Sequence, residues 1–304
     1  MGGICRCREH KMKLTIAIGS LLFLLFVPPD RVKEGPMQFP VYLNHFYLTL
    51  DHATYAAIQS SDFLRREFAV TEERTTVRKD RTYTGLYFYG TNTYFEFFDA
   101  DKETRRRVGD SAIAFGVEEP GASEKLGQAL GTQPVTITRQ LANIDIPWFQ
   151  QTMPKGISLE SGISTWIMEY HPRFLPEWHA EAGGGAGITR SDILHRYKAV
   201  LTDTPAKPYL TDVLAIKMAA STQVTRQMIE MSKVFGYGLK IDGDVAVLHG
   251  PDFELRLVPV SGSTHGIQEV SLKLRQSPAH NGELRFGSNS VLRFHSDGRA
   301  TWSF

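Results

Sequence analysis

A five-element pattern of one strand, one helix and three strands occurs twice in the first half of the chain, and it constrains the fold more than any other feature. In the first copy, a β-branched and aromatic run at 41–50 precedes an amphipathic helix at 52–68. Three more strands are expected at 69–77, 82–89 and 93–98. Because each unit must bury its apolar face against another, the repeat predicts an α+β fold of paired βαβββ modules that form a cupped mixed sheet.

The second copy of the pattern begins with an apolar strand at 111–117, followed by a helix at 122–130 that Pro120 and Gly121 introduce. Its three remaining strands are expected at 135–141, 146–152 and 165–170. The first module pair therefore occupies residues 40–172.

The last third of the chain repeats the pattern in a shortened form. Strands are expected at 212–219, 239–241, 245–249, 253–259, 266–274, 283–286, 291–295 and 299–304, and a helix at 222–235. A short loop at 277–282 replaces the helix that a fourth module would need. We therefore predict a second, reduced module pair at 209–304, which agrees with about two domains for a chain of 304 residues.

Two segments fall outside the modules. Residues 173–208 are polar and interrupted by proline and glycine, a composition that is typical of a linker or lid. A short helix is expected within this segment at 191–201, with Ser191 as its N-cap. Residues 1–39 are interpreted as a signal or anchor segment and a spacer.

The amino-terminal segment has the pattern of an export signal. Basic residues at 10–13 precede an apolar run at 14–27, which is shorter than the ~20 residues that a transmembrane helix needs. The pattern indicates an exported protein, periplasmic or extracellular, either cleaved or held by an uncleaved anchor. A buried amino-terminal strand or helix is the alternative.

Charge and cysteine content exclude several classes of function. Thirty-four basic and 33 acidic residues give a net charge of +1, so no strong field attracts nucleic acid, and contact with a membrane is expected only through the amino-terminal segment. The two cysteines, Cys5 and Cys7, precede the predicted modules. A disulfide framework, a cysteine nucleophile and a cysteine-based zinc site are therefore excluded from the folded body.

The order of the modules, together with four short segments, resembles the vicinal-oxygen-chelate superfamily, which includes glyoxalase I, bleomycin-resistance proteins and extradiol dioxygenases. The segments that carry the resemblance are 44–51 (NHFYLTLD), 93–98 (TYFEFF), 112–117 (AIAFGV) and 166–170 (WIMEY). The resemblance covers residues 40–171 well and the last third loosely. It implies a fold more directly than an activity.

The resemblance also implies a metal site. Its ligand positions map to His45, Glu96 and Glu169, whereas Ala112 stands where a fourth ligand, usually histidine, is expected. One imidazole and two carboxylates suit zinc, manganese, iron or nickel, and three ligands leave coordination positions for substrate. His171, which shares a strand face with Glu169, is a weaker replacement for the missing histidine.

Three functions follow from these residues. The preferred one is a small-molecule-binding, glyoxalase-like protein of unknown substrate, in which Tyr47, Tyr94, Phe98 and His171 contact the ligand without metal. The alternative is a metal-dependent lyase, isomerase or dioxygenase that uses the His45, Glu96 and Glu169 site. An exported interaction domain with a vestigial cavity is the third. The expected partner is a small molecule, and a homodimer is left open.

Overall fold

The computed structural model describes residues 1–2, 39–102, 106–156, 162–182, 187–262, 264–278 and 282–304. Gly35–Phe304 forms one compact unit. The apolar run at 14–27 lies outside the described residues, so the export signal stays a prediction. Within the described ranges, no helix is both long and apolar enough to span a membrane.

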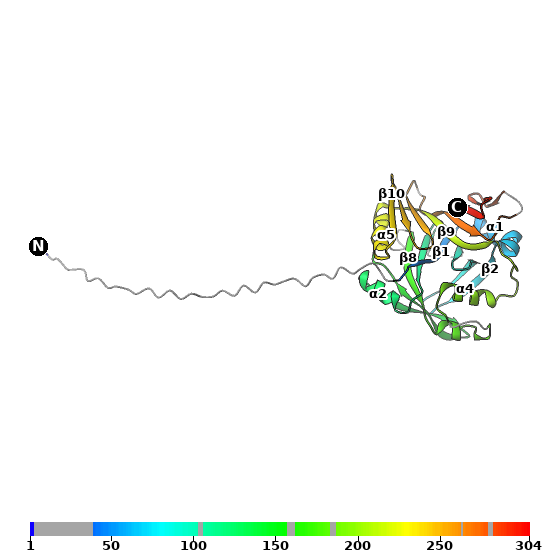
Figure 1. The fold of residues 1–304 in the computed structure, drawn as a ribbon, viewed down its shortest axis with the longest axis horizontal. Helices are drawn as coiled ribbons and strands as arrows, with labels where there is room; N and C mark the ends of the chain where they lie inside the picture. Colours follow the sequence, from blue (N-terminus) through cyan, green and yellow to red (C-terminus); the bar gives the residue numbers. More distant parts are fainter. Residues whose placement is uncertain (3–38, 103–105, 157–161, 183–186, 263, 279–281) are drawn as a thin grey trace. The chain divides into compact units, whose positions relative to one another are not determined.

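In the part of the chain that the structure describes, sixteen strands form two eight-stranded sheets with the same topology (Figure 1). The first has the order β2-β3-β4-β1-β5-β8-β7-β6, and the second β10-β11-β12-β9-β13-β16-β15-β14. The strands of the first sheet are β1 (Tyr42–Leu50), β2 (Val70–Val77), β3 (Thr82–Tyr89), β4 (Tyr94–Asp99), β5 (Ser111–Val117), β6 (Val135–Leu141), β7 (Ile144–Thr152) and β8 (Ile163–Tyr170). Those of the second are β9 (Leu210–Ala220), β10 (Gly238–Asp242), β11 (Val245–His249), β12 (Glu254–Pro259), β13 (Gly266–Leu274), β14 (Glu283–Phe286), β15 (Ser290–Phe294) and β16 (Arg299–Ser303). The α+β fold of paired βαβββ modules is thereby confirmed.

Short helices connect the strands. They are α1 (His52–Gln59), a π-helical turn (Leu64–Phe68), α2 (Ala122–Ala129), α3 (Phe174–Glu177), a 3-10 turn (Ala180–Ala182), α4 (Arg190–Ala199) and α5 (Thr222–Val234). Figure 1 shows α5 beside the second sheet and α4 beside β2. In the second module pair, the described residues between β13 and β14 form no helix, as expected.

Two helix boundaries differ from the prediction. The helix predicted at 52–68 ends at Gln59, because Ser60 and Ser61 hydrogen-bond locally: Ser60 Oγ donates to the Ala57 carbonyl, and Ser61 Oγ accepts from the Leu64 N–H. Such bonds compete with the helical ladder. The N-cap of α4 is Thr189 and not Ser191, since Thr189 forms a capping box with Asp192.

The main core lies between the two sheets. Trp302 of β16 is fully buried, and its ring centroid lies 5.2 Å from that of Phe97, 5.7 Å from that of Phe88 and 5.9 Å from that of Phe95. These three phenylalanines come from β3 and β4, so one face of the first sheet packs on the second sheet. The other face of the first sheet is left for a separate set of side chains.

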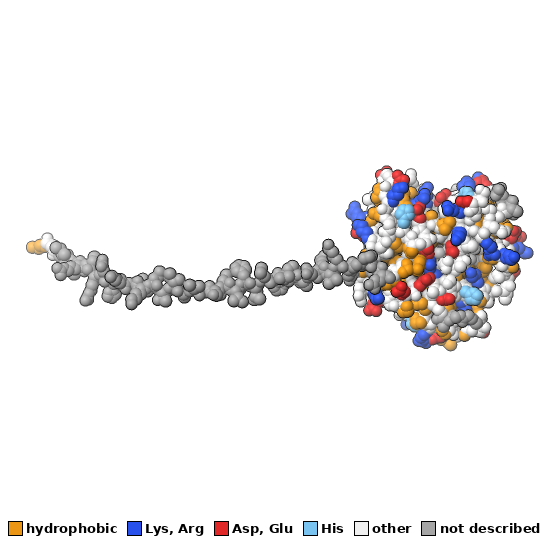
Figure 2. Space-filling model, viewed as in Figure 1, with side chains coloured by type: hydrophobic (Ala, Val, Ile, Leu, Met, Phe, Trp, Pro, Cys, Tyr) orange, Lys and Arg blue, Asp and Glu red, His pale blue; other side chains and the backbone are white. Residues whose placement is uncertain are grey.

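The first sheet curls into a half-barrel, and its edge strands β2 and β6 come into contact. Aromatic side chains from the segment predicted as a linker or lid pack onto its concave face. Trp178 stacks on Phe174, and the Tyr197 hydroxyl accepts a hydrogen bond from Trp148 Nε1 at 2.9 Å. Residues 173–182 and 187–199 therefore cover one part of the half-barrel. On the outer surface in Figure 2, acidic and basic side chains are interspersed.

Candidate functional site

Five side chains from the two central strands meet on the concave face of the first sheet. His45, Tyr47 and Thr49 share one face of β1, because alternate residues of a strand point the same way. The ladder aligns His45 with Tyr94 and Tyr47 with Glu96. Both pairs therefore point into the half-barrel, as the sequence predicted for this face.

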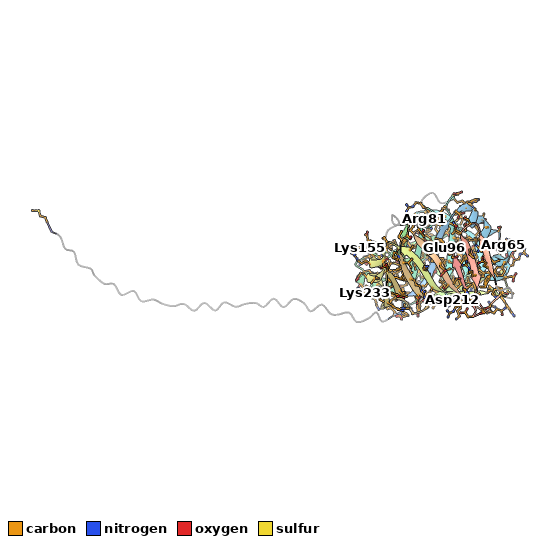
Figure 3. All side chains as sticks on the ribbon, turned by 90° about the horizontal axis from the view of Figure 1, so that it is seen from above. Arg65, Arg81, Glu96, Lys155, Asp212 and Lys233 are labelled. Atoms are coloured by element: carbon orange, nitrogen blue, oxygen red, sulfur yellow. The ribbon has the colours of Figure 1, made fainter. Side chains whose placement is uncertain are left out.

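The imidazole of His45 and the carboxyl group of Glu96 lie next to each other in this interior. Their relative exposures are 4% and 6%, and His45 Nε2 lies 3.7 Å from Glu96 Oε1, which is too far for a hydrogen bond. Figure 3 places Glu96 within the folded body, whereas Lys233 lies at its periphery. The two atoms are close enough for one ligand atom, placed to the side of the line that joins them, to contact both.

A β-bulge fixes the orientation of the imidazole. The register of β1 against β5 shifts between Leu43 and His45, so Asn44 lies beside His45 and its Oδ1 is 2.8 Å from His45 Nδ1. Because an amide oxygen only accepts, Nδ1 carries the proton. The lone pair of Nε2 therefore faces Glu96.

Burial keeps both groups uncharged over a wide pH range. It raises the pKa of Glu96 to about 7, although Arg74 and Arg106 act in the opposite direction. It also lowers the pKa of His45 to about 3, and the charge of Arg74 adds to that change. Between these values Glu96 is a hydrogen-bond donor and His45 Nε2 an acceptor. A ligand hydroxyl that lies beside both groups would accept a hydrogen bond from Glu96 and donate one to His45 Nε2.

Aromatic rings surround these two polar groups. Tyr94 stacks on His45 with 4.3 Å between ring centroids, and Trp166 approaches His45 edge-on at 5.4 Å. Tyr47 contacts Phe98 edge-on at 5.4 Å between centroids. The predicted ligand-contacting residues Tyr47, Tyr94 and Phe98 thus lie together around His45 and Glu96.

Four buried polar atoms in this region have no hydrogen-bond partner among the described residues. They are Thr49 Oγ1, Tyr87 OH, Ser164 Oγ and Trp166 Nε1. Ser164 Oγ lies close enough to Tyr47 to influence its ionisation, but it does not reach hydrogen-bond geometry. Tyr87 OH likewise lies close to Thr76 and to the Glu96 carboxyl group without reaching hydrogen-bond geometry with either. An unpaired buried polar atom costs about 1–3 kcal/mol, so a cluster of them on one face requires an explanation.

The predicted ligand Glu169 does not belong to this cluster. The ladder aligns Glu169 with Val117 of the intersheet core, so its side chain points away from the concave face. Its carboxylate oxygens accept hydrogen bonds from the N–H groups of Gly121 and Ser123, each at 2.8 Å, at the start of α2. Glu169 therefore caps a helix, which corrects its predicted assignment as a metal ligand.

His171 also lies outside the cluster. It is half-buried beyond the end of β8, and its Nδ1 accepts a hydrogen bond from the backbone N–H of Arg173 at 3.2 Å. The predictions that His171 replaces a missing metal ligand or contacts the ligand are corrected, because its ring is held in this turn. Ala112, by contrast, aligns with Tyr47 and lies on the concave face, where it offers no ligand atom.

The residues present do not fit the three-ligand metal centre that the resemblance implies. His45 Nε2 and Glu96 Oε1 would supply two ligands. Within the described ranges, no third histidine, cysteine or carboxylate brings a ligand atom close to these two. The cations of Arg74 and Arg106, which act on Glu96, further disfavour a divalent ion there.

The family of the chain follows from its match to a family model. Residues 43–304 match the model described as "Family of unknown function (DUF5829)". The chain belongs to the DUF5829 family. No curated protein matches this DUF5829 chain.

Solved structures resemble this chain only weakly. A hypothetical protein from Staphylococcus aureus superposes with a TM-score of 0.48 and 10% identity, covering 81% of this chain and 95% of its own. A xylose isomerase-like TIM barrel/4-hydroxyphenylpyruvate dioxygenase fusion protein gives a TM-score of 0.47 and 13% identity, covering 79% of this chain and 38% of its own.

Sequence reasoning missed two arginines on the concave face of this DUF5829 chain. Arg74 of β2 and Arg139 of β6 are 8% and 6% exposed. Arg74 Nη1 donates to Tyr89 OH at 2.7 Å and to Glu72 Oε2 at 3.1 Å. The alternation of β2 and β6 places both arginines at inward positions, and this is the signal that would have found them.

A surface cluster near α1 is the one described group of three residues that could hold a metal. It consists of His52, Asp99 and Asp101, whose ligand atoms lie within 4.8 Å of one another. His52 Nδ1 lies 2.8 Å from Asp99 Oδ2, and this hydrogen bond raises the pKa of His52. Lys102 Nζ lies 4.0 Å from the same oxygen, so a positive charge already competes with a metal ion there.

A cleft of about 540 Å³ lies where the carboxyl end of β1 meets the second sheet. Its lining includes Leu48, Thr49, Ile267 and Phe304. His45 and Glu96 are not among its lining residues, although Thr49, which shares a strand face with His45, is.

Proposed function

We propose that the half-barrel of the first sheet binds a small hydroxylated aromatic molecule, in the manner of a metal-free protein of the vicinal-oxygen-chelate type. One observation carries the proposal: Thr49, Tyr87, Ser164 and Trp166 each bring a buried polar atom without a partner to the region of His45 and Glu96. A ligand with one or two polar groups would satisfy these atoms and so repay their desolvation.

The ring of the ligand would lie against Tyr47, Phe98 and Trp166, which already form an aromatic and apolar group. Its hydroxyl group would lie beside the His45 and Glu96 pair, within hydrogen-bond distance of both, donating to Nε2 and accepting from the protonated carboxyl group. Trp166 Nε1 would donate to a second ligand oxygen. The neutral state of both groups suits an uncharged phenol.

The metal-dependent lyase, isomerase or dioxygenase that sequence reasoning kept as an alternative has less support. Of its three ligands, His45 and Glu96 converge, whereas Glu169 is engaged by α2. The geometry therefore favours binding through hydrogen bonds and ring contacts.

Titration with phenol and catechol, followed by calorimetry and thermal unfolding, tests the proposal. A ligand that binds only the folded state raises the melting temperature with concentration. The variant Trp166→Phe removes the unpaired indole N–H and should weaken binding about tenfold. This corresponds to a loss of about 1.4 kcal/mol in binding free energy. The free variant should lose less stability than Trp302→Phe does, because Trp166 is only half-buried and no protein hydrogen bond is lost.

Trp302→Phe is the matched control. Its indole Nε1 donates to Ser290 Oγ at 2.8 Å in the second sheet, so the variant should lose stability but keep the affinity for catechol. If neither compound binds the wild type, or if Trp166→Phe binds both as tightly as the wild type does, the proposed function is wrong.

A further inference from the structure

Arg139 is a buried cation without a counter-ion. Its side chain lies on the concave face of β6 with 6% exposure, and its Nη1 has no hydrogen-bond partner among the described residues. No carboxylate in the described ranges forms an ion pair with it. Buried charges are normally paired: Arg74 and Arg190 each have a carboxylate partner, and Arg196 donates to the His179 carbonyl oxygen.

Three aromatic rings enclose the Arg139 guanidinium. Its central carbon lies 4.3 Å from the ring centroid of Trp178, 5.4 Å from that of Trp148 and 5.9 Å from that of Tyr197. Ring faces attract a cation, but they do not accept the in-plane N–H bonds of the guanidinium. The cage therefore holds Arg139 in place and leaves Nη1 as a donor without an acceptor.

A second guanidinium increases the local positive charge. Arg74 lies 5.2 Å from the Tyr197 ring centroid, and Arg139 approaches the same ring. Burial and the charge of Arg74 both lower the pKa of Arg139. Glu72, which is bonded to Arg74, is the one carboxylate that the described residues pair with these two cations. The concave face near β2 and β6 thus carries an unbalanced positive charge.

We propose that Arg139 binds the oxyanion of a small molecule, a carboxylate or a phosphate, inside the cage of Trp148, Trp178 and Tyr197. An oxyanion would accept from Nη1 and neutralise the charge that Arg74 and Arg139 share. The Tyr197 hydroxyl accepts from Trp148 Nε1, so its own proton is available as a second donor. The site depends on Arg139 and its cage and does not require the phenol site at Glu96.

Anion titration with acetate, benzoate and inorganic phosphate, at constant ionic strength against chloride, tests this site. Tryptophan fluorescence is a direct readout, because Trp148 and Trp178 contact the guanidinium. We expect one of the three anions to change the emission and raise the melting temperature of the wild type. Benzoate and acetate report a carboxylate ligand, and phosphate reports a phosphate ligand.

Arg139→Gln should weaken that anion about tenfold or more, and Arg139→Lys, which keeps the charge without the planar fork, should bind with intermediate affinity. Arg226→Gln, at an exposed position of α5, is the matched control and should bind as the wild type does. Arg139→Met should be at least as stable as the wild type without anion, because an uncompensated charge is removed.

Two results would overturn the site. One is that acetate, benzoate and phosphate change the emission and melting temperature of the wild type no more than chloride does, or that the Arg139→Gln variant responds to the anion as the wild type does. The other is an Arg139→Met variant that unfolds at a much lower temperature or does not fold, since the aromatic cage would then explain the buried arginine without a ligand. Failure of phenol and catechol to bind bears on the proposed function and leaves these outcomes unaffected.

Discussion

Replacing Glu96 by glutamine should change how the stability of the protein depends on pH. Burial raises the pKa of Glu96 from an ordinary value of 4.5 to about 7. The folded state therefore holds the proton more tightly than the unfolded state. The contribution of the protonated Glu96 carboxyl group to stability is fully present below about pH 4.5 and is lost as the pH rises through about 7.

The magnitude follows from the two pKa values. At about 1.4 kcal/mol for each pH unit, the interval from 4.5 to about 7 corresponds to about 3 kcal/mol. Glu96→Gln removes this cost while it keeps the size and hydrogen-bonding capacity of the side chain. Its free energy of unfolding, relative to the wild type, should therefore increase by about 3 kcal/mol between mildly acidic and mildly alkaline pH.

His45 contributes in the opposite direction. Its pKa is lowered to about 3 by burial and by Arg74, so its contribution is present above about pH 6.5 and is lost as the pH falls toward 3. Because Glu96 is not among the causes of that change, the effect of His45 is common to the wild type and to Glu96→Gln. It cancels when the two proteins are compared at each pH.

Urea unfolding of the wild type, Glu96→Gln and the control Glu230→Gln across this pH range measures the effect. Glu230 is exposed on α5 and pairs with Lys233 at 2.7 Å, so its variant should follow the wild type closely. Parallel curves for Glu96→Gln and the wild type would refute the reasoning, as would a relative stability that falls with rising pH.

Three further substitutions test single contacts. Thr49→Val should leave the free energy of unfolding unchanged or raise it, because Thr49 Oγ1 is buried without a partner. Thr165→Val should lower the free energy of unfolding by about 1 kcal/mol, because the Thr165 hydroxyl donates to the Ile113 carbonyl at 2.8 Å. Urea unfolding compares the two variants. Glu169→Gln should cost about 1 kcal/mol in the same assay and leave the binding of catechol unchanged, since its carboxylate caps α2; weaker binding would show that Glu169 faces the ligand after all.

The order of strands and helices along the chain could be predicted from the sequence, because the strands are short runs rich in β-branched and aromatic residues that turn residues separate. His45, Tyr47, Tyr94 and Glu96 were placed on one face correctly, since β1 and β4 run side by side and each strand alternates.

Glu169 could not be placed in the same way. Alternation shows that Glu169 and Tyr170 point to opposite faces, but it does not show which of them faces His45. That depends on the register of β8 against β5, which aligns Glu169 with Val117. A shift of one residue would exchange the two faces.

The two buried arginines depend on a feature that no single segment carries. Arg74 and Arg139 belong to β2 and β6, which lie at opposite edges of the sheet order. They become neighbours because the sheet curls until those edges meet. Twist and curvature are set by packing over the whole sheet, so alternation within a strand can place each arginine on the inward face but does not show that the two lie together.

The indole N–H resonances in a two-dimensional NMR spectrum test the central claim, that the concave face of the first sheet receives a ligand. Of the four tryptophans, Trp166 has a buried Nε1 without a partner, whereas Trp302 donates to Ser290 in the second sheet. During titration with catechol, the Trp166 signal should move with concentration and the Trp302 signal should stay in place. A Trp166 signal that does not respond, or an equal response from Trp302, would contradict the claim.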